Sequence, residues 1–131
     1  MRKAKLQVVV ADDNPKWLQM LVSIVEARFE VVATALDGES ALQAISQHKP
    51  DVAVLDLEMP GLSGIEITRE LMSNGRKPPV VICSAHAIQE LVEAAREAGA
   101  AGFVFKQCCT RDLLTAIDAA DSAQPFSPPG I

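Results

Sequence analysis

The stretch DVAVLDLEMPGLSG, residues 51–64, combines the pattern of a buried strand with a charged end. An uninterrupted apolar run over residues 52–55 ends in the carboxylate of Asp56, and a second acid and a Pro-Gly turn follow it. Such a run is typical of a strand buried on both faces of a sheet. Moving a carboxylate out of water at the end of that strand is costly unless a cation compensates it. We therefore expect Asp56 to have a cationic partner elsewhere in the chain.

Four further apolar runs of strand length accompany this one, and a helical pattern follows each of the five. The expected strands are residues 6–10, 31–35, 52–55, 80–83 and 102–105. Strands that alternate with helices of this length form a parallel sheet with right-handed crossovers and helices on both faces. The sequence therefore predicts a doubly wound α/β fold.

The first two helices have clear boundaries in the sequence. The first opens with the cap and proline pair Asn14-Pro15 and should end near Arg28. The second follows Asp37-Gly38 and closes before Lys49-Pro50. Both therefore have the length of ordinary globular helices.

The other three helices are predicted from similar signals. The third opens with a capping box from Ser63 to Glu66 and runs to the stop signal Asn74-Gly75. The fourth should end at Gly99, and the fifth follows Thr110. The residues expected to face the core from the last two helices are Ile88, Leu91, Val92, Ala95, Leu113, Leu114 and Ile117.

The composition is that of one globular domain. The chain has 131 residues, of which 49% are hydrophobic and 22% charged, and its mean hydropathy is +0.18. A net charge of -5 argues against a nucleic-acid face, because phosphate contacts need clustered lysine and arginine. The apolar run at residues 6–11 is too short for a secretory signal, and no run approaches the ~20 apolar residues that cross a bilayer. We therefore expect a cytoplasmic chain without membrane or direct nucleic-acid contact.

Polar side chains collect at the ends of four expected strands. Asp12 and Asp13 follow the first strand, Asp56 the third, Ser84 the fourth and Lys106 the fifth. Ligands of open parallel sheets bind outside these carboxyl ends. Three carboxylates in one crevice repel each other, and a divalent cation offsets that repulsion. Oxygen ligands with open positions favour Mg²⁺.

The same residues form the parts of a phosphoryl-transfer site. Asp56 is the candidate nucleophile, Lys106 supplies a charge to the transferred group, and Ser84 supplies a hydroxyl. Each also has an ordinary structural interpretation: Asp13 merely precedes the cap Asn14, Ser84 caps the fourth helix, and Lys106 is a solvated loop lysine. The joint arrangement favours the chemical interpretation.

Four motifs at this site resemble the receiver domain of two-component response regulators. They are VVVADDNP (8–15), VLDLEMPGLSG (54–64), VVICSAH (80–86) and GAAGFVFK (99–106), and the resemblance covers residues 6 to about 120. It implies a flavodoxin-like, five-stranded parallel sheet of order 2-1-3-4-5 with five helices. It also implies a phosphorylation-activated signalling switch and not an enzyme, in which Asp56 accepts a phosphoryl group from a sensor histidine kinase.

The resemblance further assigns a metal site. It implies that Mg²⁺ is held by Asp13, Asp56 and the main-chain carbonyl of Glu58, with Asp12 acting through water. In the family, Glu58 and His86 occupy rim positions that tune how readily water reaches the acyl phosphate.

A conformational switch is the last implication of the resemblance. Once Asp56 is phosphorylated, Ser84 is expected to move toward the phosphoryl oxygen, and Phe103, three positions before Lys106, to turn into the vacated space. A plain core aromatic is the alternative interpretation of Phe103. The surface of the fourth helix, fifth strand and fifth helix would change, and a homodimer through these elements is expected. Most family members follow the lysine with proline, whereas Gln107 stands here.

The three cysteines and His48 have simpler interpretations. Cys83, Cys108 and Cys109 are an odd set without C-x-x-C spacing, which implies neither a disulfide framework nor a zinc site. We interpret them as reduced, packed thiols. His48 is predicted to lie in a surface loop.

The end of the chain is predicted to lie outside the domain. Residues 1–120 form the expected receiver, and residues 121–131 a Pro-rich linker or disordered tail. The ending AQPFSPPGI resembles the linker to a helix-turn-helix output domain in one subfamily, over a short stretch only. An output domain in a longer protein and a stand-alone receiver acting through protein contacts both stay open.

Two other functions share these residues or this fold. A phosphatase with an aspartyl-phosphate intermediate would use Asp56, Ser84 and Lys106, but it generally needs a cap over its substrate. A flavodoxin-like flavin carrier would share the fold, but Asp12 and Asp13 would repel the flavin phosphate. Both are weaker interpretations than the switch.

Overall fold

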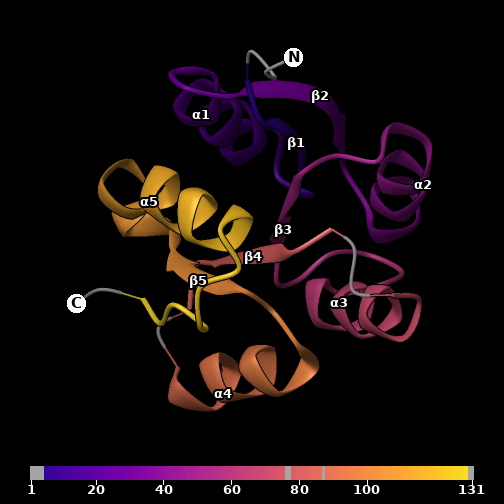
Figure 1. The fold of residues 1–131 in the computed structure, drawn as a ribbon, viewed down its shortest axis with the longest axis vertical. Coiled ribbons are helices and arrows are strands. Elements are labelled where there is room, and N and C mark those ends of the chain that lie inside the picture. Colours follow the sequence, from indigo (N-terminus) through magenta and orange to yellow (C-terminus); the bar gives the residue numbers. More distant parts are fainter. Residues whose placement is uncertain (1–4, 76–77, 87, 130–131) are drawn as a thin grey trace.

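The computed structural model describes residues 5–75, 78–86 and 88–129. They form one parallel sheet of order β2-β1-β3-β4-β5 and five α-helices (Figure 1). The strands are β1 (Gln7–Ala11), β2 (Glu30–Ala35), β3 (Val52–Asp56), β4 (Val80–Ser84) and β5 (Gly102–Phe105). The helices are α1 (Pro15–Glu26), α2 (Gly38–His48), α3 (Gly64–Ser73), α4 (Gln89–Ala98) and α5 (Cys109–Asp121), and the 3-10 turn η1 (Lys106–Cys108) joins β5 to α5. The predicted doubly wound α/β fold is confirmed.

The sheet is covered by helices on both faces. Helices α2, α3 and α4 lie on one face, and α1 and α5 on the other (Figure 1). Along β1, Val9 packs in the core on the α2, α3 and α4 face, while Val8 and Val10 pack in the core on the α1 and α5 face. Every residue of β3 and β4 is buried, because these strands have a neighbour on each side and helices above and below. This explains why each of the two strands is continuously apolar up to its last residue, Asp56 in β3 and Ser84 in β4. No helix in the described ranges is both long and apolar enough to span a membrane.

Local signals place most helix ends as predicted. The Asn14 side chain accepts hydrogen bonds from the main-chain N–H groups of Lys16 and Trp17 at the start of α1. Ser63 and Glu66 form the predicted capping box of α3. These caps satisfy N–H groups that have no partner within the helix.

The start of α4 differs from the prediction. Ile88 lies before the helix as its N-cap residue and is 47% exposed, so its expected place in the core is wrong. Its backbone is extended, and its side chain therefore does not continue the helical stripe. Helix α5 begins at Cys109, two residues earlier than predicted.

The C-terminal segment is paired with the sheet rather than frayed. Ser127 forms a parallel bridge with Gly102 at the outer edge of β5: its N–H donates to the carbonyl of Ala101 at 3.1 Å, and its carbonyl accepts from the N–H of Phe103 at 3.0 Å. Phe126 packs against the core on the α2, α3 and α4 face. The pairing satisfies main-chain groups at the sheet edge. The role of this segment as a linker stays a prediction.

Gly64 allows the loop after β3 to close against the end of that strand. A Cβ at position 64 would lie 2.5 Å from the main-chain oxygen of Asp56, closer than real Cβ contacts. The Gly64 N–H also donates to the carbonyl of Leu57 at 3.0 Å. The missing side chain therefore helps to set the main chain around Asp56.

Gly64→Ala should lower the free energy of unfolding by about 1–3 kcal/mol, because the backbone at Asp56 has to shift. Gly102→Ala is the matched control, since the nearest neighbours of its Cβ would lie at an ordinary 3.8 Å. The control should change the free energy by less than about 0.5 kcal/mol. Urea unfolding followed by circular dichroism measures both, and equal losses would contradict the steric explanation.

Candidate functional site

The strand register brings the carboxyl ends of four strands to one edge of the sheet. Ala11 of β1 lies opposite Leu55 of β3, and Ser84 of β4 lies opposite Phe105 of β5. The polar residues at or after these positions therefore become neighbours. A pocket of about 270 Å³ opens there, and the side chains that line it include those of Asp13, Trp17, Asp56, Ser84, His86 and Lys106.

Three carboxylates converge at this edge. Asp12, Asp13 and Asp56 each offer an oxygen atom within 4.8 Å of the others. Asp12 and Asp56 are buried, whereas Asp13 is exposed to solvent. This donor set fits Mg²⁺, which prefers hard oxygen ligands and keeps several waters, because the exposed side of the cluster leaves room for them.

Lys106 is the cationic partner that the sequence demanded for Asp56. Its Nζ lies 3.1 Å from Oδ1 of Asp56 and 2.7 Å from Oδ2 of Asp12. The lysine is only 6% exposed, so the interpretation as a solvated loop residue is wrong. Burial alone would lower the pKa of Lys106, but hydrogen bonding to Asp12 and the charge of Asp56 outweigh burial and raise it. The ammonium therefore stays charged.

Asp56 is harder to ionise than an ordinary aspartate. Its pKa is raised from 3.8 to about 6, first because the carboxyl is buried and second because the charge of Asp12 is near, while Lys106 opposes the shift. One ammonium therefore does not fully compensate the carboxylates around it. A further cation at this edge would favour the ionised form of Asp56.

The two acids after β1 have different surroundings. Oδ1 of the buried Asp12 accepts a hydrogen bond from the Asn14 N–H at 2.9 Å, while its other oxygen contacts Lys106. Asp13 precedes the α1 cap, as its ordinary interpretation has it, but it also lines the pocket. That Asp13 binds Mg²⁺ directly and Asp12 acts on it through water stays a prediction.

Ser84 is buried beside the pocket and does not cap α4. Its Oγ accepts a hydrogen bond from the His86 N–H at 3.0 Å, and α4 begins later, at Gln89. Glu58 and His86 lie at the rim as exposed residues, where Nε2 of His86 is 3.5 Å from Oε1 of Glu58. This contact across the pocket mouth was not predicted from the sequence.

Phe103 is already packed inside the protein. It is almost completely buried in β5, and its ring meets that of Phe105 edge to face, with centroids 6.0 Å apart. Its role as a moving aromatic stays a prediction. Gln107, which replaces the usual proline, is an exposed residue of η1.

The cysteines and His48 are not part of the site. Burial raises the pKa of the Cys83 and Cys109 thiols, and Cys108 is partly buried against the core. These positions agree with packed, reduced thiols. His48 is exposed as predicted, but it is the last residue of α2 and not a loop residue.

Trp17 lines the pocket and was not predicted from the sequence to belong to the site. It lies in the first turn of α1, and its ring faces Nζ of Lys106 at 5.3 Å from the ring centroid. The available signal was its position four residues after Asp13, on the helix that begins at the acidic pair.

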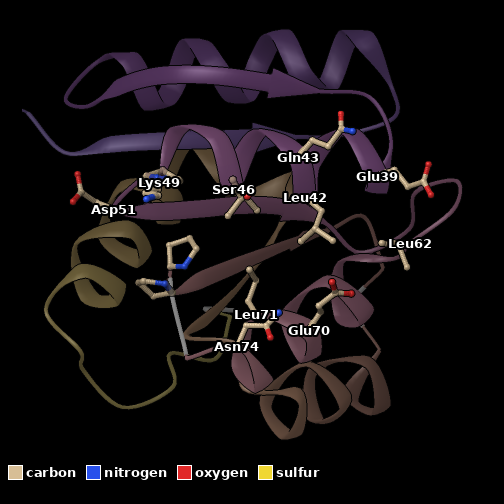
Figure 2. A pocket seen from close by; sticks show the side chains of 14 residues that line it. Glu39, Leu42, Gln43, Ser46, Lys49, Asp51, Leu62, Glu70, Leu71 and Asn74 are labelled. Carbon is tan, nitrogen blue, oxygen red and sulfur yellow. The ribbon is translucent and has the colours of Figure 1, made fainter.

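A larger hollow of about 1230 Å³ lies between α2 and α3 (Figure 2). Leu42, Leu62 and Leu71 contribute apolar surface, and Glu39 and Glu70 carry separate charges. None of the three clustered aspartates lines it. Within the described residues, those three aspartates are the only group of three potential metal ligands that converges. Side-chain chemistry, and not volume, therefore identifies the candidate site.

Comparisons with known proteins agree with this geometry. The family described as Response regulator receiver domain matches residues 8–118. The transcriptional regulatory protein PdtaR of Mycobacterium tuberculosis is 35% identical over 117 residues, which are 88% of this chain and 57% of that protein. DegU of Brevibacillus brevis is 32% identical over 115 residues, which are 86% of this chain and 49% of that protein. The chain thus spans about half the length of these curated relatives.

A solved structure extends the likeness to three dimensions. The crystal structure of a LuxR-family two-component response regulator from Aurantimonas sp. SI85-9A1 has a TM-score of 0.87 and 30% identity, and the match covers 94% of this chain and 89% of that one. The family match covers both the sheet and the strand ends that carry the acidic cluster. This chain therefore belongs to the receiver-domain family of two-component response regulators.

Proposed function

We propose that this domain is a phosphorylation-activated switch in which Asp56 accepts a phosphoryl group from a phosphohistidine of a sensor histidine kinase. The observation that carries the proposal is the contact of the buried Asp56 carboxylate with Lys106 at 3.1 Å, beside two further aspartates at an open pocket. Buried charges gathered in this way are costly for stability alone. Their arrangement fits phosphoryl transfer.

The chemistry assigns a role to each side chain. An oxygen of ionised Asp56 attacks phosphorus, the P–O bond forms as the P–N bond to the histidine breaks, and the departing imidazole keeps the electron pair of that bond. The ammonium of Lys106 neutralises charge on the phosphoryl oxygens. The Ser84 hydroxyl donates a hydrogen bond to one of these oxygens. Later attack by water on phosphorus releases inorganic phosphate and restores Asp56.

A divalent cation completes the proposed site. Asp13, Asp56 and the main-chain carbonyl of Glu58 would hold Mg²⁺, and Asp12 would act on it through water. When bound, the ion supplies positive charge that offsets the repulsion between carboxylates and phosphoryl oxygens. The proposal is supported by the converging carboxylate oxygens and by the raised pKa of Asp56.

The output is proposed to pass through Ser84 and Phe103. Movement of the Ser84 hydroxyl toward the phosphoryl group would alter packing around Phe103 and so change the surface of α4, β5 and α5. We further propose that phosphorylation favours a homodimer through this surface. The curated relatives PdtaR and DegU are named as transcriptional regulators. We also propose that this surface controls either a transcriptional output domain of the same protein or a separate partner protein, and that the protein acts in the cytoplasm.

Incubation with acetyl phosphate and Mg²⁺ should add one phosphoryl group, at Asp56. Asp56→Asn should abolish the addition, because an amide cannot replace the carboxylate nucleophile. Intact mass followed by peptide mapping measures both. Labelling that persists in the Asn variant would refute the assignment. Turnover of a phosphate monoester with release of its alcohol would instead identify a phosphatase, and a coloured purified protein a flavin carrier.

Asp13→Asn should weaken Mg²⁺ binding by at least about tenfold, because even loss of an outer partner of a metal site commonly costs ~10–100-fold in affinity. Asp121→Asn removes the same charge at the exposed end of α5 and serves as the control. Isothermal titration with MgCl₂ compares the three proteins. Equal weakening by both substitutions would mean that net charge, and not ligation, controls the affinity.

The acidic cluster should make stability depend on pH. Because the pKa of Asp56 is raised from 3.8 to about 6, the folded state keeps a proton in this window that the unfolded state has lost. Stability should therefore fall as the pH rises through the window and level off above it. Asp56→Asn should raise the melting temperature more at about pH 7 than at about pH 4, with EDTA present. A gain that is the same at both values would count against an unfavourable charge at position 56.

A further inference from the structure

Trp17 connects the start of α1 to the acidic cluster. Its main-chain N–H donates to Oδ1 of the cap Asn14 at 3.1 Å, which anchors the residue in the first turn of the helix. Its partly buried indole ring lines the pocket, and Nζ of Lys106 lies 5.3 Å from the ring centroid. This distance is within the range of a cation–π contact.

The ammonium of Lys106 has three neighbours. Two carboxylates, of Asp12 and Asp56, lie 2.7 and 3.1 Å from Nζ, and the face of Trp17 is the third neighbour. A lysine ammonium has three N–H donors and a flexible four-carbon stem, so it takes up the position that its neighbours jointly favour.

The two carboxylates differ in their exposure to the pocket. Asp56, Trp17 and Lys106 line the pocket, whereas Asp12 is fully buried and does not line it. The shorter contact draws the ammonium toward Asp12, away from the pocket. Because Trp17 lines the pocket, the attraction of its ring favours a position of the ammonium at the pocket.

We propose that Trp17 is a positioning residue that holds the Lys106 ammonium on the pocket side of the acidic cluster, within reach of a phosphoryl group on Asp56. This inference rests on the proposed function and deepens it. The ring touches neither phosphorus nor its leaving group, and acts only through Lys106.

The first test compares rates of phosphorylation by acetyl phosphate and Mg²⁺. Trp17→Leu keeps apolar bulk but removes the aromatic face, and should slow labelling by about three- to tenfold. Trp17→Phe keeps a smaller aromatic face and should recover part of the rate. Met20→Leu, an exposed position on the same helix, is the control and should leave the rate unchanged. Equal rates for the Leu and Phe variants would overturn the proposal.

The second test needs no phosphodonor. The ¹⁵N resonance of Lys106 Nζ should shift in Trp17→Leu, through loss of the ring current, and by less in Trp17→Phe. Trp17 is the sole tryptophan of the chain, so its emission reports this site alone. Lys106→Met, which removes the charge at similar length, should change that emission.

The two tests separate this inference from the proposed function. If the unsubstituted protein is not labelled at Asp56, the proposed function fails, while the resonance and the emission still decide whether the ring holds the lysine. An unshifted Lys106 resonance together with unchanged Trp17 emission would overturn the inference. Should Trp17→Leu not fold, the Phe variant and the emission of Lys106→Met decide the outcome.

Discussion

The ion pairs of Lys106 with Asp12 and Asp56 are the interactions on which the site depends. All three side chains are buried, and each would cost several kcal/mol in isolation. The pairs exist only because β1, β3 and β5 end at the same edge of one parallel sheet. Each of the three buried charges is therefore compensated only in the folded chain, where the strands bring the other two beside it.

Negative charge exceeds positive charge at this edge of the sheet, and the proposed chemistry depends on that excess. The three carboxylates lie together, but the one ammonium contacts only Asp12 and Asp56, and burial together with the charge of Asp12 keeps the pKa of Asp56 near 6. The cluster is thus suited to gain a cation on its exposed side, beside Asp13. Under the proposed phosphorylation of Asp56, the ammonium of Lys106 would contact phosphoryl oxygens in place of part of its contact with the carboxylates.

Strand β5 joins this edge to the rest of the molecule. Lys106 follows its last residue, Phe103 is buried within it, and Ser127 pairs with its outer edge through Ala101 and Phe103. A displacement of the lysine would therefore act on a strand of four residues that also holds the C-terminal segment. The short strand gives the proposed switch a physical route from the acidic cluster to the surface.

The strands, most helix ends and the gathering of five polar residues could be predicted from the sequence, because hydrophobic period, caps and strand ends are local patterns, and parallel strands bring their ends together. Three contacts could not be predicted and appear only in the folded chain: Lys106 lies closer to Asp12 than to Asp56, Trp17 faces this lysine, and Ser127 pairs with Gly102. Ile88 fits the helical period and is nevertheless exposed. These outcomes depend on the distances between residues far apart in the chain, and such distances arise only when the elements pack.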